Sequence, residues 1–191
     1  MIVLDTERHI YKLADGTEIP SVSEIIKDGL NIQYVGLNDF YATRGKYIHK
    51  AIELFNKNVL DMNSLVPHIQ NFFQSYLSFH NEYIQKVIEI EKIVYNEELR
   101  YAGTLDMVVK LKYSKEPIII DIKTGSYQGF YELQTAGYWL AYGNKKCKRG
   151  LLMLDNEGKQ AKLIMCENKR DMDVFKGLVH LYYWKKENKI L

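Results

Sequence analysis

Two carboxylates and a lysine lie within the most apolar part of the 191-residue sequence. Asp106 follows Gly103-Thr104-Leu105, and the later run Ile118-Ile119-Ile120-Asp121-Ile122-Lys123 carries Asp121 and Lys123. A buried charge is costly unless it is paired or bound to a metal ion. We therefore expect these three side chains to form a site rather than to serve solubility.

A divalent metal ion would explain the carboxylates. Alternate residues of a strand point to one face, so Asp121 and Lys123 project together, and Asp106 on the neighbouring strand can reach the same side. Carboxylates at close range repel each other, and a divalent cation relieves that repulsion by taking hard oxygen ligands. The backbone carbonyl of Ile122 and a nitrogen of His49 are further candidate ligands.

Mg²⁺ held by carboxylates and water is a usual arrangement for phosphate-ester chemistry. Beside such an ion, Lys123 either orients or deprotonates the attacking water, or neutralises charge in the transition state. The sequence leaves both roles open. The structural alternative is a buried Asp121–Lys123 ion pair in a sheet, with Asp106 capping a turn.

Hydrophobic periodicity predicts the elements that position these residues. Residues 1–20 read as a hairpin with strands at 2–4 and 9–13 and a turn at 14–17, followed by a helix capped by Ser21 or Ser23. The predicted helices are 22–30, 37–58, 65–86, 130–142 and 169–187, with residues 31–41 as a loop entering the second. The predicted later strands are 88–96, 101–113, 118–123, 149–154 and 160–166.

Short connections join the strands 88–96, 101–113 and 118–123, and we expect these three to form an antiparallel meander. The strand after helix 130–142 joins them through a right-handed crossover. The fold class is therefore α/β or α+β, with a central mixed sheet flanked by helices. In the last helix we expect four residues to face inward: Val174, Leu178, Leu181 and Trp184.

Other groups near the site follow from the same elements. Helix 37–58 carries His49 and, one turn later, Glu53, while Glu91 lies in strand 88–96. In helix 130–142, Tyr131, Gln134 and Tyr138 share one face because they are spaced at i, i+3 and i+7.

Composition limits the classes of partner and cofactor. The net charge of +2 is weak evidence for a polyanionic partner, but basic residues cluster at Arg44-Gly45-Lys46 and at 145–149. Fifteen tyrosines suit a nucleic-acid groove, although compositional bias would also explain them. The two cysteines form no CxxC and no quartet, so neither a zinc ribbon nor an iron–sulfur cluster is supported. No run approaches the roughly 20 apolar residues of a membrane span.

The sequence resembles the PD-(D/E)xK nuclease superfamily, and within it the RecB-like and phage-type exonucleases. The resemblance rests on motifs in the family's order: Gly45-x-x-x-His49, Gly103-Thr104-Leu105-Asp106, Asp121-Ile122-Lys123-Thr124-Gly125 and Gln134-x-x-x-Tyr138. The segment Ile19-Pro20-Ser21-Val22-Ser23 also resembles the opening of phage-type members. It implies a restriction-endonuclease-like fold over one domain, residues 1–191, with an N-terminal hairpin and helix (1–36), a core (37–166) and a C-terminal helix (167–191).

The resemblance also implies roles for individual residues. Asp106, Asp121 and Lys123 would be catalytic, and the metal ligands would be His49, Asp106, Asp121 and the Ile122 carbonyl. Supporting or DNA-binding roles fall on Gln134, Tyr138, Tyr131, Arg44, Lys46 and Thr124. Glu91 and Glu53 rank below these as acidic residues that could approach the metal.

The leading hypothesis is a Mg²⁺-dependent deoxyribonuclease, with Mn²⁺ able to substitute, acting as an exonuclease in recombination, repair or phage replication. The alternatives are a site-specific or structure-specific endonuclease of the same fold and a non-catalytic nucleic-acid-binding module. Expected partners are DNA, single-stranded or with free ends, and a separate helicase or single-strand annealing or binding protein, since the sequence has no phosphate-binding loop of a motor. The expected compartment is the cytoplasm of a bacterium or a phage-infected host.

Overall fold

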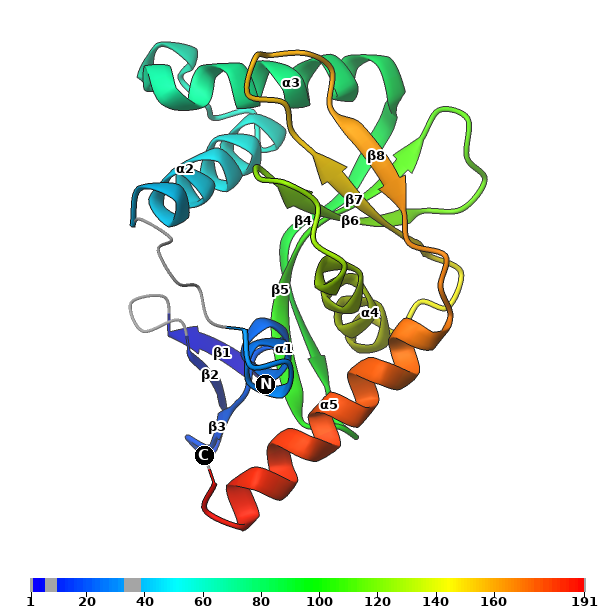
Figure 1. Cartoon of the computed structure of the whole chain (residues 1–191). Helices are drawn as coiled ribbons and strands as arrows, with labels where there is room; N and C mark the ends of the chain where they lie inside the picture. Colours follow the sequence, from blue (N-terminus) through cyan, green and yellow to red (C-terminus); the bar gives the residue numbers. More distant parts are fainter. Residues whose placement is uncertain (1, 6–9, 33–38, 191) are drawn as a thin grey trace.

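A five-stranded mixed sheet in the order β4-β5-β6-β7-β8 forms the centre of the structure, a computed structural model that describes residues 2–5, 10–32 and 39–190 (Figure 1). Its strands are β4 (Ile84–Asn96), β5 (Tyr101–Leu111), β6 (Ile118–Lys123), β7 (Lys148–Met153) and β8 (Lys162–Met165). A smaller sheet contains β1 (Ile2–Asp5), β2 (Ile10–Leu13) and β3 (Glu18–Ile19). The helices are α1 (Val22–Gly29), α2 (Asp39–Asn56), α3 (Pro67–Tyr83), α4 (Phe130–Tyr142) and α5 (Arg170–Glu187), with a 3₁₀ turn at Met62–Ser64.

The strand pairings confirm the predicted fold class. Strands β4, β5 and β6 form an antiparallel meander, β6 and β7 pair in parallel across the α4 crossover, and β7 and β8 are antiparallel. Register pairs Met107 with Ile120 and Asp121 with Leu151. The result is the expected mixed sheet with helices on its faces.

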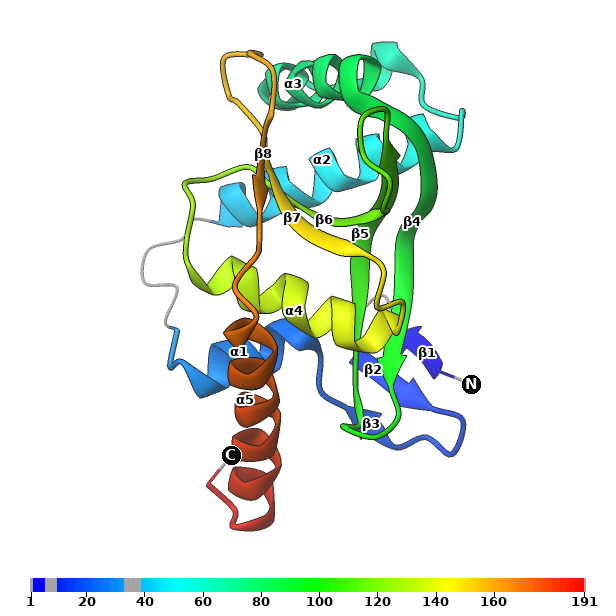
Figure 2. The ribbon, with the colours of Figure 1, turned by 90° about the vertical axis from the view of Figure 1, so that its right-hand side faces the viewer.

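The two faces of the sheet are covered by different helices. Helices α2 and α3 bury one set of side chains, including Ile48, Phe73 and Met107, while α1, α4 and α5 bury another. Figures 1 and 2 show α2 and α3 at one end of the long strands and α5 at the other. Val108 and Ile119 belong to the second set. Because side chains alternate along a strand, Asp106, Asp121 and Lys123 fall on the face of Val108 and Ile119, beneath α4.

Helix ends are set by local chemistry. Ser21 caps α1: its hydroxyl accepts from the Glu24 amide, and the Glu24 carboxylate accepts from the Ser21 amide. Of the two serines proposed for this cap, the structure uses Ser21. Gly143, with φ of 75°, ends α4 in the left-handed conformation that glycine adopts without penalty.

Several predicted boundaries need correction. Strand β4 begins at Ile84, whereas the helix was expected to continue to residue 86. Strand β2 pairs with β3 as well as with β1, so the expected hairpin is a three-stranded sheet. Residues 6–9 and 33–38 lie outside the described residues. They include the beginning of the predicted 9–13 strand, most of the predicted 31–41 loop and the expected start of the second helix at residue 37.

Helix α5 buries a different stripe from the one predicted. Val174, Leu181 and Trp184 are exposed, and of the four expected residues only Leu178 is buried. The buried stripe also contains Phe175, Val179 and Tyr182. Phe175 packs edge-on against Tyr101 with ring centroids 5.0 Å apart, and the Tyr182 hydroxyl donates to Glu24 over 2.6 Å. These contacts determine which stripe of α5 is buried.

Within the described residues no helix combines the length and the apolar character that crossing a membrane requires.

Candidate active site

Neighbouring strands bring Asp106 and Asp121 into one buried cluster. The Oδ2 atom of Asp106, on β5, accepts a 2.6 Å hydrogen bond from the backbone amide of Ile122, on β6. Asp106 and Asp121 are both buried. Sheet pairing therefore fixes the Asp106 side chain against the strand that carries Asp121 and Lys123.

Lys123 is held by partners from β6 and α4. Its Nζ lies 2.7 Å from Asp121 Oδ2, donates to Gln134 Oε1 over 2.9 Å, and sits 4.6 Å from the centre of the Tyr131 ring. The Gln134 amide donates in turn to the Tyr138 hydroxyl over 2.9 Å. The α4 face predicted from spacing thus converges on the lysine.

One oxygen of Asp121 lacks a hydrogen bond. Asp121 Oδ2 is buried, and no donor among the described residues meets it with hydrogen-bond geometry, although Lys123 Nζ is at ion-pair distance. The Lys123 ammonium attracts this oxygen by its charge, but the contact lacks hydrogen-bond geometry. A buried carboxylate oxygen in this condition can accept a cation or a water.

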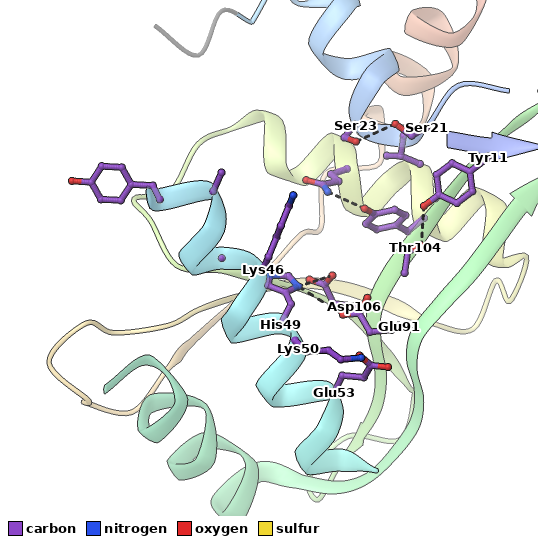
Figure 3. Close-up of a pocket in the computed structure, with 17 residues that line it drawn as sticks. Tyr11, Ser21, Ser23, Lys46, His49, Lys50, Glu53, Glu91, Thr104 and Asp106 are labelled. Carbon is purple, nitrogen blue, oxygen red and sulfur yellow. Dashed lines mark hydrogen bonds and ion pairs between the residues drawn. The ribbon is translucent and has the colours of Figure 1, made fainter. Parts of the chain in front are cut away.

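Two further side chains that could bind a metal ion, His49 and Glu91, lie next to Asp106 (Figure 3). His49 Nδ1, on α2, lies 3.2 Å from Asp106 Oδ1 and 3.8 Å from Glu91 Oε1. Among the described residues, His49, Glu91 and Asp106 form the one group of three or more whose ligand atoms all lie within 4.8 Å of one another. Asp121 stands outside that trio.

Glu91 reaches this position through an unusual backbone. Its φ is 47°, in the left-handed region that a non-glycine residue adopts at a cost of about 1 kcal/mol or more. The pairing of β4 with β5 stays in register around it, because Ile90 pairs with Met107 and Lys92 with Leu105. This register places Glu91 opposite Asp106 on the adjacent strand.

The charges of the cluster shift one another's pKa values. Burial alone would lower the pKa of His49, but the Asp106 and Glu91 carboxylates outweigh it and raise that pKa from 6.5 to about 10. Burial raises the pKa of Asp121 to about 6, against the opposing effect of Lys123. Burial would also raise the pKa of Asp106, yet His49 and Lys123 hold it below its usual value.

Burial raises the pKa of Glu91, and the carboxylates outweigh burial to raise the pKa of Lys123. At neutral pH the metal-free cluster therefore keeps His49 and Lys123 protonated between carboxylates.

Two cavities open on either side of His49. One, of about 500 Å³, is lined by His49, Glu91 and Asp106 and continues to Tyr11, Ser21 and Ser23 in the N-terminal part of the chain. The other, of about 630 Å³, is lined by His49, Lys123 and residues around Thr124. Tyr41 and Ala42 line both. An extended ligand could therefore pass the cluster from one cavity to the other.

The remaining predicted residues lie at the rim of these cavities. Arg44 donates to the Thr124 carbonyl over 3.3 Å, which ties α2 to the end of β6. Lys46 lines the first cavity. Glu53 also borders that cavity, but its carboxylate pairs with Lys50 at 2.8 Å and with Lys57 at 2.6 Å and is not in the trio.

Sequence reasoning did not foresee the contribution of the N-terminal sheet. The Tyr11 hydroxyl lies 2.8 Å from Thr104 Oγ1, and Ala102 donates to the Pro20 carbonyl over 3.0 Å. Gly103 makes room for α4, because a Cβ there would lie 2.7 Å from the Tyr138 ring. The Gly103-Thr104 pair in the acidic motif was the available signal, since a small residue in a strand indicates close approach.

The donor set fits a hard divalent cation. Two carboxylates and one imidazole converge in the trio, and the unused oxygen of Asp121 lies in the same cluster as Asp106. Carboxylate oxygens are the ligands that suit Mg²⁺ and Mn²⁺, while the cysteines, Cys147 and Cys166, are buried and take no part in the trio.

Comparisons with known proteins give likeness in structure alone. No protein-family model and no curated protein matches the sequence. Among solved structures, the chain is similar to the alkaline exonuclease LHK-Exo from Laribacter hongkongensis, with 14% identity, TM-score 0.37, and coverage of 90% of this chain and 94% of that one.

The complex of LHK-Exo with dAMP gives 12% identity, TM-score 0.49, and coverage of 90% and 89%. The protein SSO0001 gives 15% identity, TM-score 0.32, and coverage of 83% and 81%. At these scores the function of this chain rests on the geometry of its own site.

Proposed function

We propose that the chain is a divalent-metal-dependent deoxyribonuclease, and that it acts on DNA ends as an exonuclease. The observation that carries the proposal is the meeting of His49, Glu91 and Asp106 with the Asp121–Lys123 pair between two open cavities. The order of the motifs supports an exonuclease, because it resembles that of the RecB-like and phage-type members of the PD-(D/E)xK superfamily.

His49, Glu91 and Asp106 would hold Mg²⁺ or Mn²⁺, with Asp121 Oδ2 and the Ile122 carbonyl as further ligands on the β6 side. Lewis-acid activation of water and of the phosphoryl oxygen is what the bound ion supplies. Asp106 is fixed for this role by the Ile122 amide, and its lowered pKa keeps it ionised. An ionised carboxylate is the form that binds a cation.

Lys123 would neutralise negative charge that develops on the phosphate. Its raised pKa keeps it protonated at neutral pH, which favours this role over that of a base. Gln134, which is itself bonded to Tyr138, holds the ammonium in position, and the Tyr131 ring covers one side of it. Arg44 and Lys46, at the rim, would contact phosphates of the DNA strand.

The test is digestion of covalently closed, nicked and linear forms of one plasmid with Mg²⁺, with Mn²⁺ and with EDTA. We expect mononucleotides or short oligonucleotides from linear DNA, no products from the closed circle, and no activity in EDTA. Cleavage of the closed circle would contradict exonuclease action and support an endonuclease. No cleavage of any form by the folded, metal-supplemented protein would contradict the proposed function.

A further inference from the structure

A cluster of exposed aromatic rings borders the two cavities, on α2 and the beginning of α3. Phe40 is 48% exposed and Tyr47 54%. Their rings flank His68, with centroids 5.4 Å and 6.4 Å away. Contiguous patches of exposed apolar side chains mark interaction sites.

The rings lead directly to the proposed active site. The centroid of Phe40 lies 5.8 Å from that of Tyr41, which lines both cavities and is 49% exposed. The Arg44 guanidinium lies 5.0 Å from the centre of the Tyr41 ring and donates to Thr124, next to Lys123. The four rings, which we call the aromatic platform (Phe40, Tyr41, Tyr47 and His68), thus extend one rim of the Lys123 cavity outward.

The charge of this surface suits a polyanion. Residues 40–50 and 62–81, which carry the four rings of the platform, contain no aspartate or glutamate, and the acidic residues that flank these stretches are Asp39, Glu53, Asp61 and Glu82. Arg44 and Lys46 lie in the first of these stretches. The phosphates of a nucleic-acid strand on the platform would meet these cations and no carboxylate from either stretch.

We propose that the aromatic platform stacks the unpaired bases of a DNA single strand whose phosphate backbone continues into the active site. Every base presents a π-face, so stacking on tyrosine, phenylalanine and histidine holds a strand without reading its sequence. A duplex has no unpaired bases to offer, and the preferred substrate is therefore single-stranded DNA or an end with separated strands. The inference rests on the proposed nuclease function and adds the class of substrate to it.

The test measures binding without cleavage. A Lys123→Ala chain is titrated, with Mg²⁺ present, with an oligothymidylate carrying 2-aminopurine at successive positions, whose fluorescence falls on stacking. Phe40→Ala and Tyr47→Ala are introduced singly and together in this background. Tyr113→Ala is the matched control, because Tyr113 is an 87% exposed tyrosine beyond the end of β5, away from the platform.

We expect each platform substitution to weaken single-strand binding about tenfold and to remove quenching at one 2-aminopurine position. Binding of a blunt duplex should be weaker and should change little. Thermal melting checks that the exposed substitutions leave the fold intact.

Unchanged affinity and unchanged quenching in the double variant would overturn the platform, even if the unsubstituted chain cleaves DNA. A dimer of the unsubstituted chain that dissociates on Tyr47→Ala would also overturn it, because a second copy would then cover this surface. Platform-dependent binding together with an unsubstituted chain that cleaves no DNA would instead overturn the proposed nuclease function.

Discussion

Metal binding at this site should release about one proton, and that proton should come from His49. The ring nitrogen lies 3.2 Å from Asp106, and the surrounding carboxylates raise the pKa of His49 to about 10. A histidine binds a metal ion in its neutral form, so the ion must displace the proton. Substitution of His49 by glutamine removes the titrating group and leaves a side chain of similar polarity.

The size of the effect follows from the pKa. A pH of 7 lies about three units below the His49 pKa of about 10. Competition from the bound proton therefore lowers metal affinity at pH 7 roughly 1,000-fold, or about 4 kcal/mol, relative to the affinity at high pH. Affinity should therefore rise about tenfold per pH unit through neutral pH. Below about pH 6, where Asp121 also takes a proton, the dependence should become steeper.

The same pKa shift has a consequence for the metal-free fold. The folded pKa of His49 lies above the 6.5 of a free histidine. Its stabilising contribution is thus complete below pH 6.5 and is lost as the pH rises towards 10.

Calorimetric titration with Mn²⁺ at pH 7.5, in buffers of different ionisation enthalpy, measures the protons released. We expect a value near one for the unsubstituted chain and near zero for His49→Gln. His180→Gln, at an exposed position on α5, is the matched control and should still release one. The reasoning is refuted if the unsubstituted chain releases no proton, or if His49→Gln releases as many as the control.

Three further substitutions test the packing around the site. Gly103→Ala places a Cβ 2.7 Å from the Tyr138 ring and should lower the melting temperature by about 5 °C. Gly129→Ala, which has open space around the new Cβ, should leave the melting temperature unchanged. Equal melting temperatures of the two variants would contradict the close approach at Gly103. Tyr138→Phe removes the hydroxyl that accepts from Gln134 and should lower kcat about fivefold to tenfold with little change in melting temperature, and an unchanged kcat would remove it from the site. Arg149→Met leaves buried Asp171 without its 3.0 Å partner and should cost about 3–5 kcal/mol of unfolding free energy by urea denaturation; a loss under about 1 kcal/mol would refute the ion pair's role.

The elements nearest the chemistry could be predicted from the sequence to the residue. Strand Ile118–Lys123 lies between Pro117 and Gly125, and helix Phe130–Tyr142 between Gly129 and Gly143. Glycine and proline interrupt regular structure, so these boundaries are written locally. The i, i+3, i+7 spacing on α4 also predicts that Tyr131, Gln134 and Tyr138 share one face, and in the structure Tyr131 and Gln134 on that face contact Lys123.

Other features depend on contacts that no local pattern contains. Helix α3 passes into β4 at Ile84 without a turn residue, so its apolar pattern gave no boundary. Helix α5 offers two overlapping apolar stripes, and Phe175 is chosen by its fit against Tyr101 and against the bare backbone of Gly137, where a Cβ would lie 2.7 Å from its ring. The left-handed backbone conformation of Glu91 also has no local signal, because the residue is a glutamate and not a glycine.

The proposed hydrolysis of DNA by Lys123 and the metal-binding trio is tested most directly by the cleavage rate of end-labelled linear DNA. The unsubstituted chain is compared in Mg²⁺ with Lys123→Ala and with the control Lys115→Ala. Lys115 is an exposed lysine in the turn before β6. Equal melting temperatures of the three proteins show that the substitutions leave the fold intact. We predict that Lys123→Ala releases labelled product at least about 1,000-fold more slowly than the unsubstituted chain, whereas Lys115→Ala matches it. Metal-dependent cleavage by Lys123→Ala at the rate of the control would contradict the account.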